Sequence, residues 1–233
     1  VVDGNEIAVY KVKDPAEIPW QETGVEVVIE CSGLFTDRDT ASKHLHGSVK
    51  KVIISAPGKG VDGTFVMGVN EASYDTNKHQ VIANASCTTN CLTPIVYLLN
   101  NAYGIKHAQR STTHSYTSDQ NLLDNSHPKD MRRARAAADN IVPTTTGAAI
   151  ATTEVIPELK GKISGISLRV PTSTVSVLYL VAELNQAVSS IVDGLSTDVV
   201  DGTMVSVVAW YDNEWGYTQR LVNLTEYICG KLS

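Results

Sequence analysis

The sequence predicts an α/β fold in two parts: a parallel sheet in the first third of the chain, then an α+β region with an antiparallel sheet. Short apolar strands alternating with helical segments predict the parallel sheet, because helical crossovers usually join such strands. Longer strands with alternating apolar and polar residues, at 162–170, 175–184 and 204–211, predict the antiparallel sheet. A strand, a tight turn and a helix at 81–99 connect the two parts.

The first part contains the shorter elements. We expect a β-hairpin at 1–12, further strands at 25–30, 51–55, 66–69 and 81–83, and a short helix at 36–46. Ligands bind at the carboxyl ends of parallel strands, so the loops 31–35 and 55–57 are candidate binding loops, although both also have the composition of ordinary turns. We expect no G-x-G-x-x-G fingerprint in the chain, although a complete dinucleotide-binding domain would open with one, so that this domain would be absent or would lack its first half.

The segment 79–99 carries the strongest functional signal. Cys87 is expected in the first turn of a helix, directly after the turn at 84–86. Unpaired N–H groups and the positive end of the helix dipole favour a thiolate there, so we expect a lowered pKa and a nucleophilic sulfur. Ser86 and Thr88 flank the thiol with hydroxyl groups that can donate to an anion.

Two less specific interpretations stay open for this segment. Cysteine is commonly buried and inert, and Cys91, one helical turn after Cys87, fits a packing role. Two thiols at this spacing are also compatible with a metal, but further ligands are not close in sequence. No metal site is therefore predicted.

The second part places further polar residues at strand ends and helix starts. The strand 105–113 ends at His114, and three threonines at 144–146 precede a helix, either as an N-cap or as a phosphate cradle. Three arginines within 132–135 indicate a solvated face, an anion site or a subunit contact. Arg169 lies in an otherwise apolar strand, where a cation needs a partner or a ligand. The chain is expected to end in a helix.

A thiolate nucleophile needs a base, and six histidines are available. His114 is the best placed, at a strand end, whereas the other five have polar surroundings and are expected at the surface. A Cys–His pair performs acyl chemistry through a hemithioacetal or a thioester. The hydroxyl clusters and Arg169 indicate an anionic, phosphate-bearing substrate.

The composition excludes several classes of protein. A formal net charge of −6 argues against a nucleic-acid-binding role. No apolar run approaches the ~20 residues that span a membrane, and the first residues lack signal-peptide character. Four cysteines among 233 residues indicate a reducing compartment rather than a disulfide scaffold.

Six motifs that follow one another along the chain resemble the family of phosphorylating glyceraldehyde-3-phosphate dehydrogenases. They are ASCTTNCLTP at 85–94, HSYTSDQ at 114–120, RRARAAA at 132–138, TTTGAA at 144–149, LRVPT at 168–172 and WYDNEWGY at 210–217. The likeness implies a partial Rossmann-type dinucleotide-binding domain at 1–86, on which the C-terminal helix at 214–233 packs back. It also implies a catalytic domain at 87–213 and a homotetramer.

The resemblance further implies a reaction, the oxidative phosphorylation of glyceraldehyde 3-phosphate to 1,3-bisphosphoglycerate with NAD or NADP. Cys87 would be the nucleophile that carries the hemithioacetal and the thioester, and His114 the base. The other implied contacts are Thr117 and Arg169 for the substrate phosphate, Ser86, Thr88, Thr146 and Gly147 for inorganic phosphate, Asn213 for the nicotinamide carboxamide, and Ser32, Gly33 and Phe35 for the cofactor cleft. A cytoplasmic enzyme is expected, with a plastid as the alternative.

The chain departs from the family in two segments. The opening glycine-rich unit of ~60 residues is expected to be absent, and about forty residues are expected to be missing at 185–188. Ser126 stands where NAD-specific members typically have proline, which favours NADP because a hydroxyl can bond a 2′-phosphate. These departures leave an alternative open: a truncated, dehydrogenase-inactive chain with a reactive thiol, acting as a weak esterase or a redox-sensitive binding module.

Overall fold

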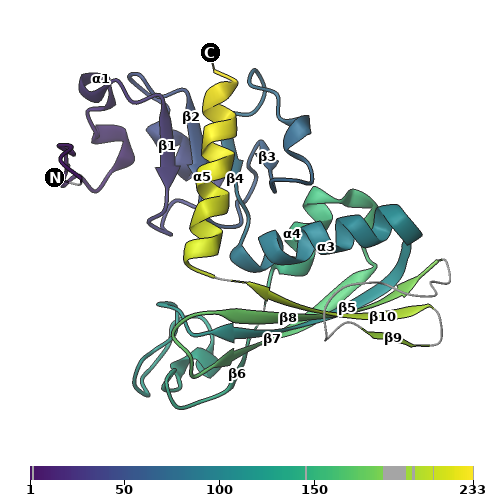
Figure 1. Cartoon of the computed structure of the whole chain (residues 1–233). Helices are drawn as coiled ribbons and strands as arrows, with labels where there is room; N and C mark the ends of the chain where they lie inside the picture. The colour runs from purple at the N-terminus through teal and green to yellow at the C-terminus, as the bar shows by residue number, and fades with distance from the viewer. Residues whose placement is uncertain (2, 145, 186–197, 201–202, 212, 233) are drawn as a thin grey trace.

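The computed structural model of the chain describes residues 1, 3–144, 146–185, 198–200, 203–211 and 213–232. Two sheets organise these residues, a four-stranded parallel sheet in the order β1-β2-β4-β3 and a six-stranded mixed sheet in the order β6-β7-β5-β8-β10-β9 (Figure 1). Helices pack on both sheets, so the predicted α/β fold class, a partial Rossmann-type sheet followed by an α+β region, is confirmed.

The strands of the first sheet are β1 (Val27–Glu30), β2 (Lys51–Ile54), β3 (Gly63–Thr64) and β4 (Val81–Ala83). Those of the second sheet are β5 (Ile105–Ser115), β6 (Val142–Thr144), β7 (Ile163–Val170), β8 (Ser176–Leu184), β9 (Asp198–Val200) and β10 (Met204–Tyr211). The α-helices are α1 (Trp20–Thr23), α2 (Arg38–Ala41), α3 (Cys87–Tyr103), α4 (Ala148–Val155) and α5 (Trp215–Gly230). Short 3-10 helices occur at Pro15–Glu17, Ser42–His44, Glu71–Ser73, Met131–Ala134 and Pro157–Leu159.

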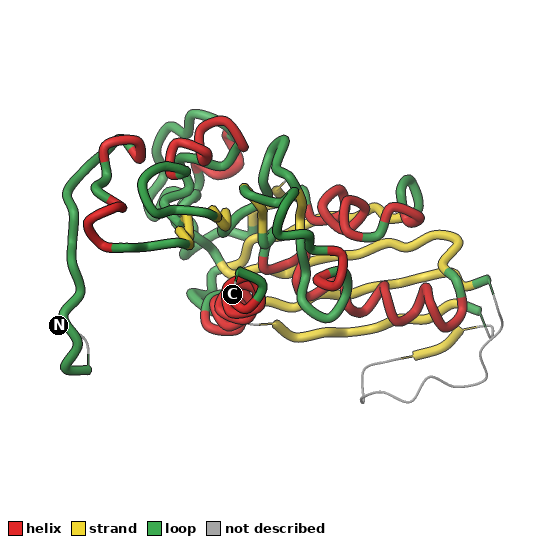
Figure 2. The backbone as a smooth tube through the Cα atoms, turned by 90° about the horizontal axis from the view of Figure 1, so that it is seen from above, coloured by secondary structure: helices red, strands yellow, loops and turns green. Residues whose placement is uncertain are grey.

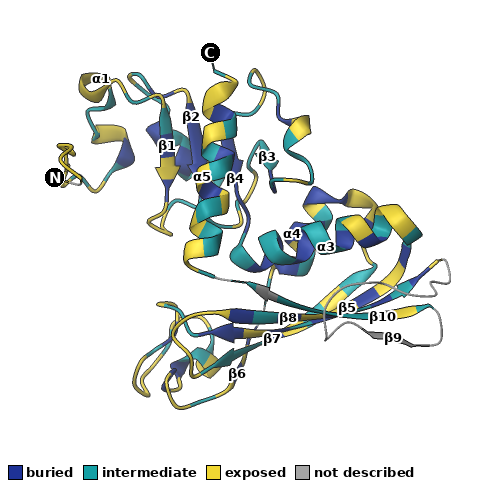
Figure 3. Ribbon diagram, viewed as in Figure 1, coloured by how far each residue is buried: buried dark blue, intermediate teal, exposed yellow. Residues whose placement is uncertain are grey.

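Helix α3 begins where the sequence predicts it and covers one face of the second sheet. The Ser86 side chain caps the helix by accepting a hydrogen bond from Thr89 N at 3.2 Å. Leu92, Val96 and Leu99 recur at helical spacing and are buried against apolar side chains of β5 and β8. Figure 3 shows the buried sides of α3 and α4 facing this sheet. The packing fixes the N-terminus of α3 over the sheet.

Helix α5 is last in the sequence but packs on the first sheet. Its buried residues Leu221, Leu224 and Ile228 belong to one apolar cluster with Ile53 of β2 and Ile82 of β4. Figures 1 and 2 show α5 lying across this sheet, although β10, which precedes it, belongs to the other one. The chain thus returns from the second sheet to the first just after Tyr211.

Two predicted elements are wrong. Residues 6–12 form no strand and are mostly exposed: they do not add to the free edge of β1, which pairs only with β2. Figure 2 shows this segment extending from the body. Residues 66–69 form a turn rather than a strand, because Val66 N donates to Asn70 Oδ1 at 2.8 Å and Val69 N to the Val66 carbonyl at 3.1 Å.

Three other expectations need refinement. The second sheet is mixed, because β5 and β7 run parallel and the connection between them contains α4, as a parallel pair requires. The arginine-rich segment forms only the 3-10 helix Met131–Ala134. Gly58, Gly60 and Gly63 do have the G-x-G-x-x-G spacing, but they lead into β3 instead of a helix and so lack the context of a phosphate-binding turn. The predicted junction at 185–188 lies, beyond Asn185, outside the described residues.

Candidate active site

The turn before α3 is a strained piece of backbone that presents Cys87. Ala85 has φ +55°, a left-handed conformation that non-glycine residues rarely adopt. Tyr217 of α5 donates from its hydroxyl to the Ala85 carbonyl at 3.1 Å, so the C-terminal helix holds this turn in place. Cys87 is the first residue of α3 and is half-buried. The strained residue, Ala85, thus lies in the turn that sets the position of the Cys87 thiol.

His114 faces Cys87 from the end of β5, with Nε2 3.5 Å from Sγ. Its Nδ1 lies 2.7 Å from the Ser115 carbonyl oxygen and 3.0 Å from Nη1 of Arg169. Nη1 has two better acceptors, the Ser115 carbonyl at 2.9 Å and the Thr117 hydroxyl at 3.0 Å. We therefore assign the proton to Nδ1, which donates to Ser115 and leaves Nε2 as a base toward the thiol.

Both members of the pair are neutral in this structure. Burial raises the pKa of the Cys87 thiol, and the opposing contributions from Thr88 and from the charge of Arg169 offset only part of that rise. The predicted lowering of the pKa is therefore wrong, because desolvation exceeds the effect of the helix N-terminus. Burial, and then the charge of Arg169, lower the pKa of His114 to about 4. His114 is thus an unprotonated base at neutral pH.

One open pocket of about 170 Å³ brings most of the predicted residues together. Its lining includes Cys87, His114 and Arg169 together with the four residues expected to hold inorganic phosphate, Ser86, Thr88, Thr146 and Gly147. Pro57, Ala148 and Ser167 complete the lining. The hydroxyls with the helix N-termini, and separately the guanidinium of Arg169, are two sets of groups that can bind an anion near one thiol.

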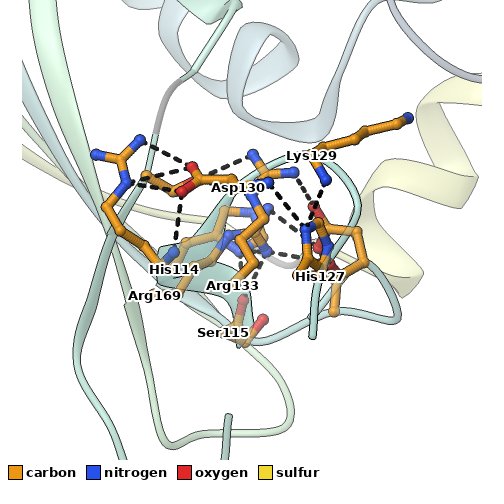
Figure 4. Close-up of polar contacts among 11 residues, drawn as sticks. His114, Ser115, His127, Lys129, Asp130, Arg133 and Arg169 are labelled. Atoms are coloured by element: carbon orange, nitrogen blue, oxygen red, sulfur yellow. Dashed lines mark hydrogen bonds and ion pairs between the residues drawn. The ribbon is translucent and has the colours of Figure 1, made fainter. Parts of the chain in front are cut away.

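Arg169 and Thr117 are in contact, as the substrate-phosphate prediction requires, with Nη1 3.0 Å from the Thr117 hydroxyl. The sequence did not reveal Asp119, to which Thr117 donates at 2.5 Å and whose carboxylate lies 4.0 Å from Nη2 of Arg169. Arg133 also pairs with Asp119, at 2.7 Å. Figure 4 shows Arg133 and Arg169 close to His114 and Ser115. The Asp119 carboxylate therefore already interacts with Arg169, the cation that an incoming substrate phosphate would contact.

Tyr211 is another residue that the sequence did not single out. It ends β10, and its hydroxyl lies 2.9 Å from that of Thr88. Its ring meets the His114 ring edge to face at a centroid distance of 5.9 Å. Burial raises the pKa of Tyr211, so it stays a neutral phenol beside the pocket.

The predicted cofactor residues fall into three places. Ser32 and Gly33 follow β1, where Ser32 N donates to Glu30 Oε1 at 2.7 Å and Gly33 has φ +74°. Phe35 packs edge to face against His44 at 6.3 Å; His44 is buried with Glu30, contrary to the expectation of a surface histidine. Asn213 is tied through Ser176 to Ser115, beside His114.

Ser126 lies apart from these residues. Its contacts are local, because its N–H donates to Asn125 Oδ1 at 2.8 Å and its carbonyl accepts from Asn121 Nδ2 at 3.1 Å. No described contact joins it to the pocket or to the loops of the first sheet. The structure therefore does not bring Ser126 to the cofactor cleft within a single chain.

The described residues fit the nicotinamide end of a dinucleotide. Strands β1, β2 and β4 are parallel neighbours in the sheet, and Ser32, Pro57 and Ala85 follow their carboxyl ends. Pro57, after β2, lines the same pocket as Cys87. A ligand bound at the carboxyl ends of this sheet would therefore reach the sulfur.

A parallel dinucleotide-type sheet beside a Cys–His pair is the arrangement expected of an oxidoreductase with a thiol nucleophile. Comparison with known proteins gives the family. Residues 86–190 match the model of the glyceraldehyde 3-phosphate dehydrogenase C-terminal domain, and residues 1–38 match that of the NAD binding domain of the same enzyme. The chain belongs to the glyceraldehyde-3-phosphate dehydrogenase family and is an NAD(P)-dependent oxidoreductase.

Curated relatives agree with this assignment. Glyceraldehyde-3-phosphate dehydrogenase 1 of Bacillus cereus is 48% identical over 269 residues, which cover 99% of this chain and 80% of the relative. The Geobacillus stearothermophilus enzyme is 49% identical with the same coverage. Glyceraldehyde-3-phosphate dehydrogenase 2 of Nostoc sp. is 47% identical over 268 residues, 99% of this chain and 79% of the relative. The alternative of a dehydrogenase-inactive chain is not favoured.

The aligned length also bears on the expected internal gap. The Bacillus cereus alignment extends over 269 positions, whereas the chain has 233 residues, so at least 36 aligned positions have no counterpart here. This difference agrees with the expectation that the chain lacks an internal segment that its relatives have. In the described part of the chain, no helix has the length and apolar character needed to cross a membrane.

Proposed function

We propose that this chain catalyses the oxidative phosphorylation of glyceraldehyde 3-phosphate, with Cys87 as nucleophile and His114 as base. One observation carries the proposal: the thiol and the unprotonated imidazole face each other at 3.5 Å between two anion-binding groups. The aldehyde substrate and the second substrate, inorganic phosphate, each bring an anion to this pocket. The two groups provide one binding position for each.

The first step adds Cys87 to the aldehyde. His114 Nε2 takes the thiol proton as Sγ bonds to the aldehyde carbon, and the imidazolium then gives this proton to the alkoxide oxygen, which completes the hemithioacetal. Arg169 and Thr117 hold the C3 phosphate and thereby orient the carbonyl over the sulfur. Since both Cys87 and His114 start neutral, the charge separation occurs only while substrate occupies the pocket.

The second step oxidises the adduct, for which NAD(P), when bound, would supply the hydride acceptor. His114 takes the hydroxyl proton of the hemithioacetal, which leaves a thioester on Cys87. Ser32, Gly33 and Phe35 are proposed to line the cofactor cleft and Asn213 to bind the carboxamide. Ser126 is proposed to favour NADP at the cofactor of a neighbouring subunit.

The third step releases the product. Inorganic phosphate, bound by Ser86, Thr88, Thr146 and Gly147, attacks the thioester carbon; the new C–O bond forms as the C–S bond breaks, and the sulfur leaves as a thiolate. The thiolate then recovers a proton from His114. Hydroxyl and backbone N–H donors bind this phosphate without a full ion pair, so its oxygen keeps its nucleophilicity.

We also propose the division of the chain and its assembly. Residues 1–86 with the C-terminal helix form the dinucleotide-binding part and residues 87–213 the catalytic part, an assignment supported by the packing of α5 on β2 and β4. The exposed apolar residues Ile141, Ile166 and Tyr179 support a homo-oligomer, proposed as a tetramer. Four free cysteines support a reducing, cytoplasmic location.

The test is NAD(P)H formation by the purified chain with glyceraldehyde 3-phosphate and phosphate, with each cofactor in turn. Cys87→Ser should lower turnover on the order of 10³-fold or more, since the nucleophile is lost. Cys91→Ser, which removes a thiol one helical turn away, is the matched control and should retain activity. A folded parent chain without Cys87-dependent turnover would refute the proposal.

A further inference from the structure

Arg110 is an unusual residue for its position in the fold. It lies on β5, which is central in the second sheet, and only 2% of it is exposed. Burying a guanidinium is costly unless a carboxylate and further hydrogen bonds compensate. In the described part of the chain no carboxylate pairs with it, and its Nε has no hydrogen-bond partner. A cost of this kind indicates a functional reason.

The surrounding backbone makes room for this side chain. Arg110 is paired across the sheet with Gly165 of β7. A Cβ at Gly165 would lie 2.5 Å from Cγ of Arg110, closer than real contacts allow. The alternation along β5 also puts Arg110 on the same face as Thr112 and His114, the face that α3 and α4 cover. Arg110 therefore belongs to the polar row that ends at the catalytic base.

The contacts of the guanidinium lead to the phosphate side of the pocket. Nη1 donates to the Thr112 hydroxyl at 2.6 Å and to the Ile166 carbonyl at 3.4 Å, and Nη2 donates to the Thr146 hydroxyl at 2.8 Å. Thr146 lines the pocket, whereas Arg110 does not. Thr146 is thus the contact through which Arg110 reaches the lining of the pocket.

The number of hydrogen bonds that the Thr146 hydroxyl can make determines where its hydrogen points. A hydroxyl has two acceptor lone pairs and one donor hydrogen. Its oxygen accepts from Arg110 Nη2 at 2.8 Å and from Ala148 N at 3.3 Å, so both lone pairs are used. None of the described residues accepts its hydrogen. The hydrogen is left to point into the pocket, and the donating cation polarises it.

From this geometry we infer that Arg110 is a positioning residue for inorganic phosphate, which holds the Thr146 hydroxyl as a donor toward that anion. The inference rests on the proposed function, because it takes the Thr146 side of the pocket as the inorganic-phosphate position. It assigns the buried cation of Arg110 to the binding of inorganic phosphate only. The aldehyde substrate, held by Arg169 and Thr117, does not depend on Arg110.

Two readouts test the inference, and one of them needs no turnover. Inorganic phosphate should slow the alkylation of Cys87 by iodoacetamide, because it occupies the pocket beside the thiol. Arg110→Met preserves the apolar packing of the side chain. In this variant, the phosphate concentration that halves the rate of Cys87 alkylation should rise on the order of tenfold, and the phosphate concentration that gives half-maximal turnover should rise by a similar factor. The KM for glyceraldehyde 3-phosphate should match that of the parent chain, which a general structural defect would not achieve.

Further variants separate positioning from stability. Thr146→Val should raise the phosphate requirement by itself, and adding Arg110→Met should then have little further effect, since both act through one hydroxyl. Arg110→Lys should restore part of the affinity if Arg110→Met folds poorly. Lys106→Met, which removes a cation from the exposed part of the same strand, is the matched control and should leave the phosphate requirement unchanged.

The outcomes are distinguishable from those of the proposed function. Equal phosphate protection in the parent chain and in Arg110→Met overturns the inference, even if the chain turns over as proposed. Additive effects of Arg110→Met and Thr146→Val overturn it as well. Absence of Cys87-dependent turnover overturns the proposed function instead, while the protection measurement still decides the role of Arg110.

Discussion

The two anion-binding groups beside Cys87 use an arginine in opposite ways. Arg169 stands at the pocket, its side chain 16% exposed, and Asp119 lies near enough to share its charge. Arg110 is buried without a described carboxylate and reaches the pocket only through the Thr146 hydroxyl. One group therefore offers a full cation that a carboxylate already partly satisfies. The other offers a neutral donor with a cation behind it.

The roles that we propose for the two phosphates account for the difference. The phosphate of glyceraldehyde 3-phosphate is a handle that takes no part in bond making, so a direct charge-assisted contact costs the reaction nothing. Inorganic phosphate is a reagent whose oxygen must attack a thioester. A direct ion pair would withdraw electron density from that oxygen, whereas a hydroxyl donor positions it with less effect on reactivity.

The largest effect is expected when the direct contact is removed. Arg169→Gln should raise the KM for glyceraldehyde 3-phosphate by about 100-fold, since a charge-assisted contact to phosphate is lost. The KM for inorganic phosphate should rise much less. Steady-state kinetics with each substrate varied in turn measure both values, and equal increases would show that the two groups are not separate.

A second, smaller effect concerns the thiol between the groups. Because burial raises the Cys87 pKa, the rate of alkylation should increase about tenfold per pH unit beyond the ordinary thiol pKa of about 8.5. Arg169 lowers this pKa, so Arg169→Gln should displace the profile to higher pH, while Arg110→Met should not. A plateau reached below the ordinary thiol pKa in the parent chain would contradict the neutral Cys–His pair.

The smallest effect is expected at the carboxylate. Asp119→Asn should lower the KM for glyceraldehyde 3-phosphate several-fold, because Thr117 no longer donates to a competing carboxylate and Arg169 no longer has one at ion-pair distance. Asp119 also raises the pKa of His114, so the substitution should lower it below about 4. Titration of the His114 ring by NMR follows this shift. An unchanged KM would mean that Asp119 does not compete with the substrate.

Local sequence signals predicted much of this site. A strand, a turn and a capped helix are encoded within about ten residues, and that pattern placed Cys87 at a helix start. His114 was identified because a strand end is also a local feature. The motifs then supplied Thr117, Thr146 and Arg169 by resemblance, and the structure brings these residues to one pocket or into contact with it.

What the sequence could not predict depends on distant parts of the chain. Polar residues occupy both faces of β5, so its alternation does not reveal that Arg110 is buried. The raised pKa of Cys87 comes from burial in the folded chain, where residues as distant in sequence as Tyr211 and Tyr217 line a pocket with it. Whether residues 6–12 form a strand depends on whether they pair with the edge strand β1, and no local sequence pattern determines such pairing.

The register between β5 and β7 has a consequence for how this enzyme can change over time. His114 is paired with Arg169, and Arg110 is paired with Gly165. Both anion-binding groups therefore depend on the same register between β5 and β7. Single substitutions can retune either group alone, because each depends on a different pair. An insertion or deletion within β5 would turn the whole polar row to the other face and remove both groups together. Length variation is therefore confined to the loops, while the two substrate specificities can diverge independently.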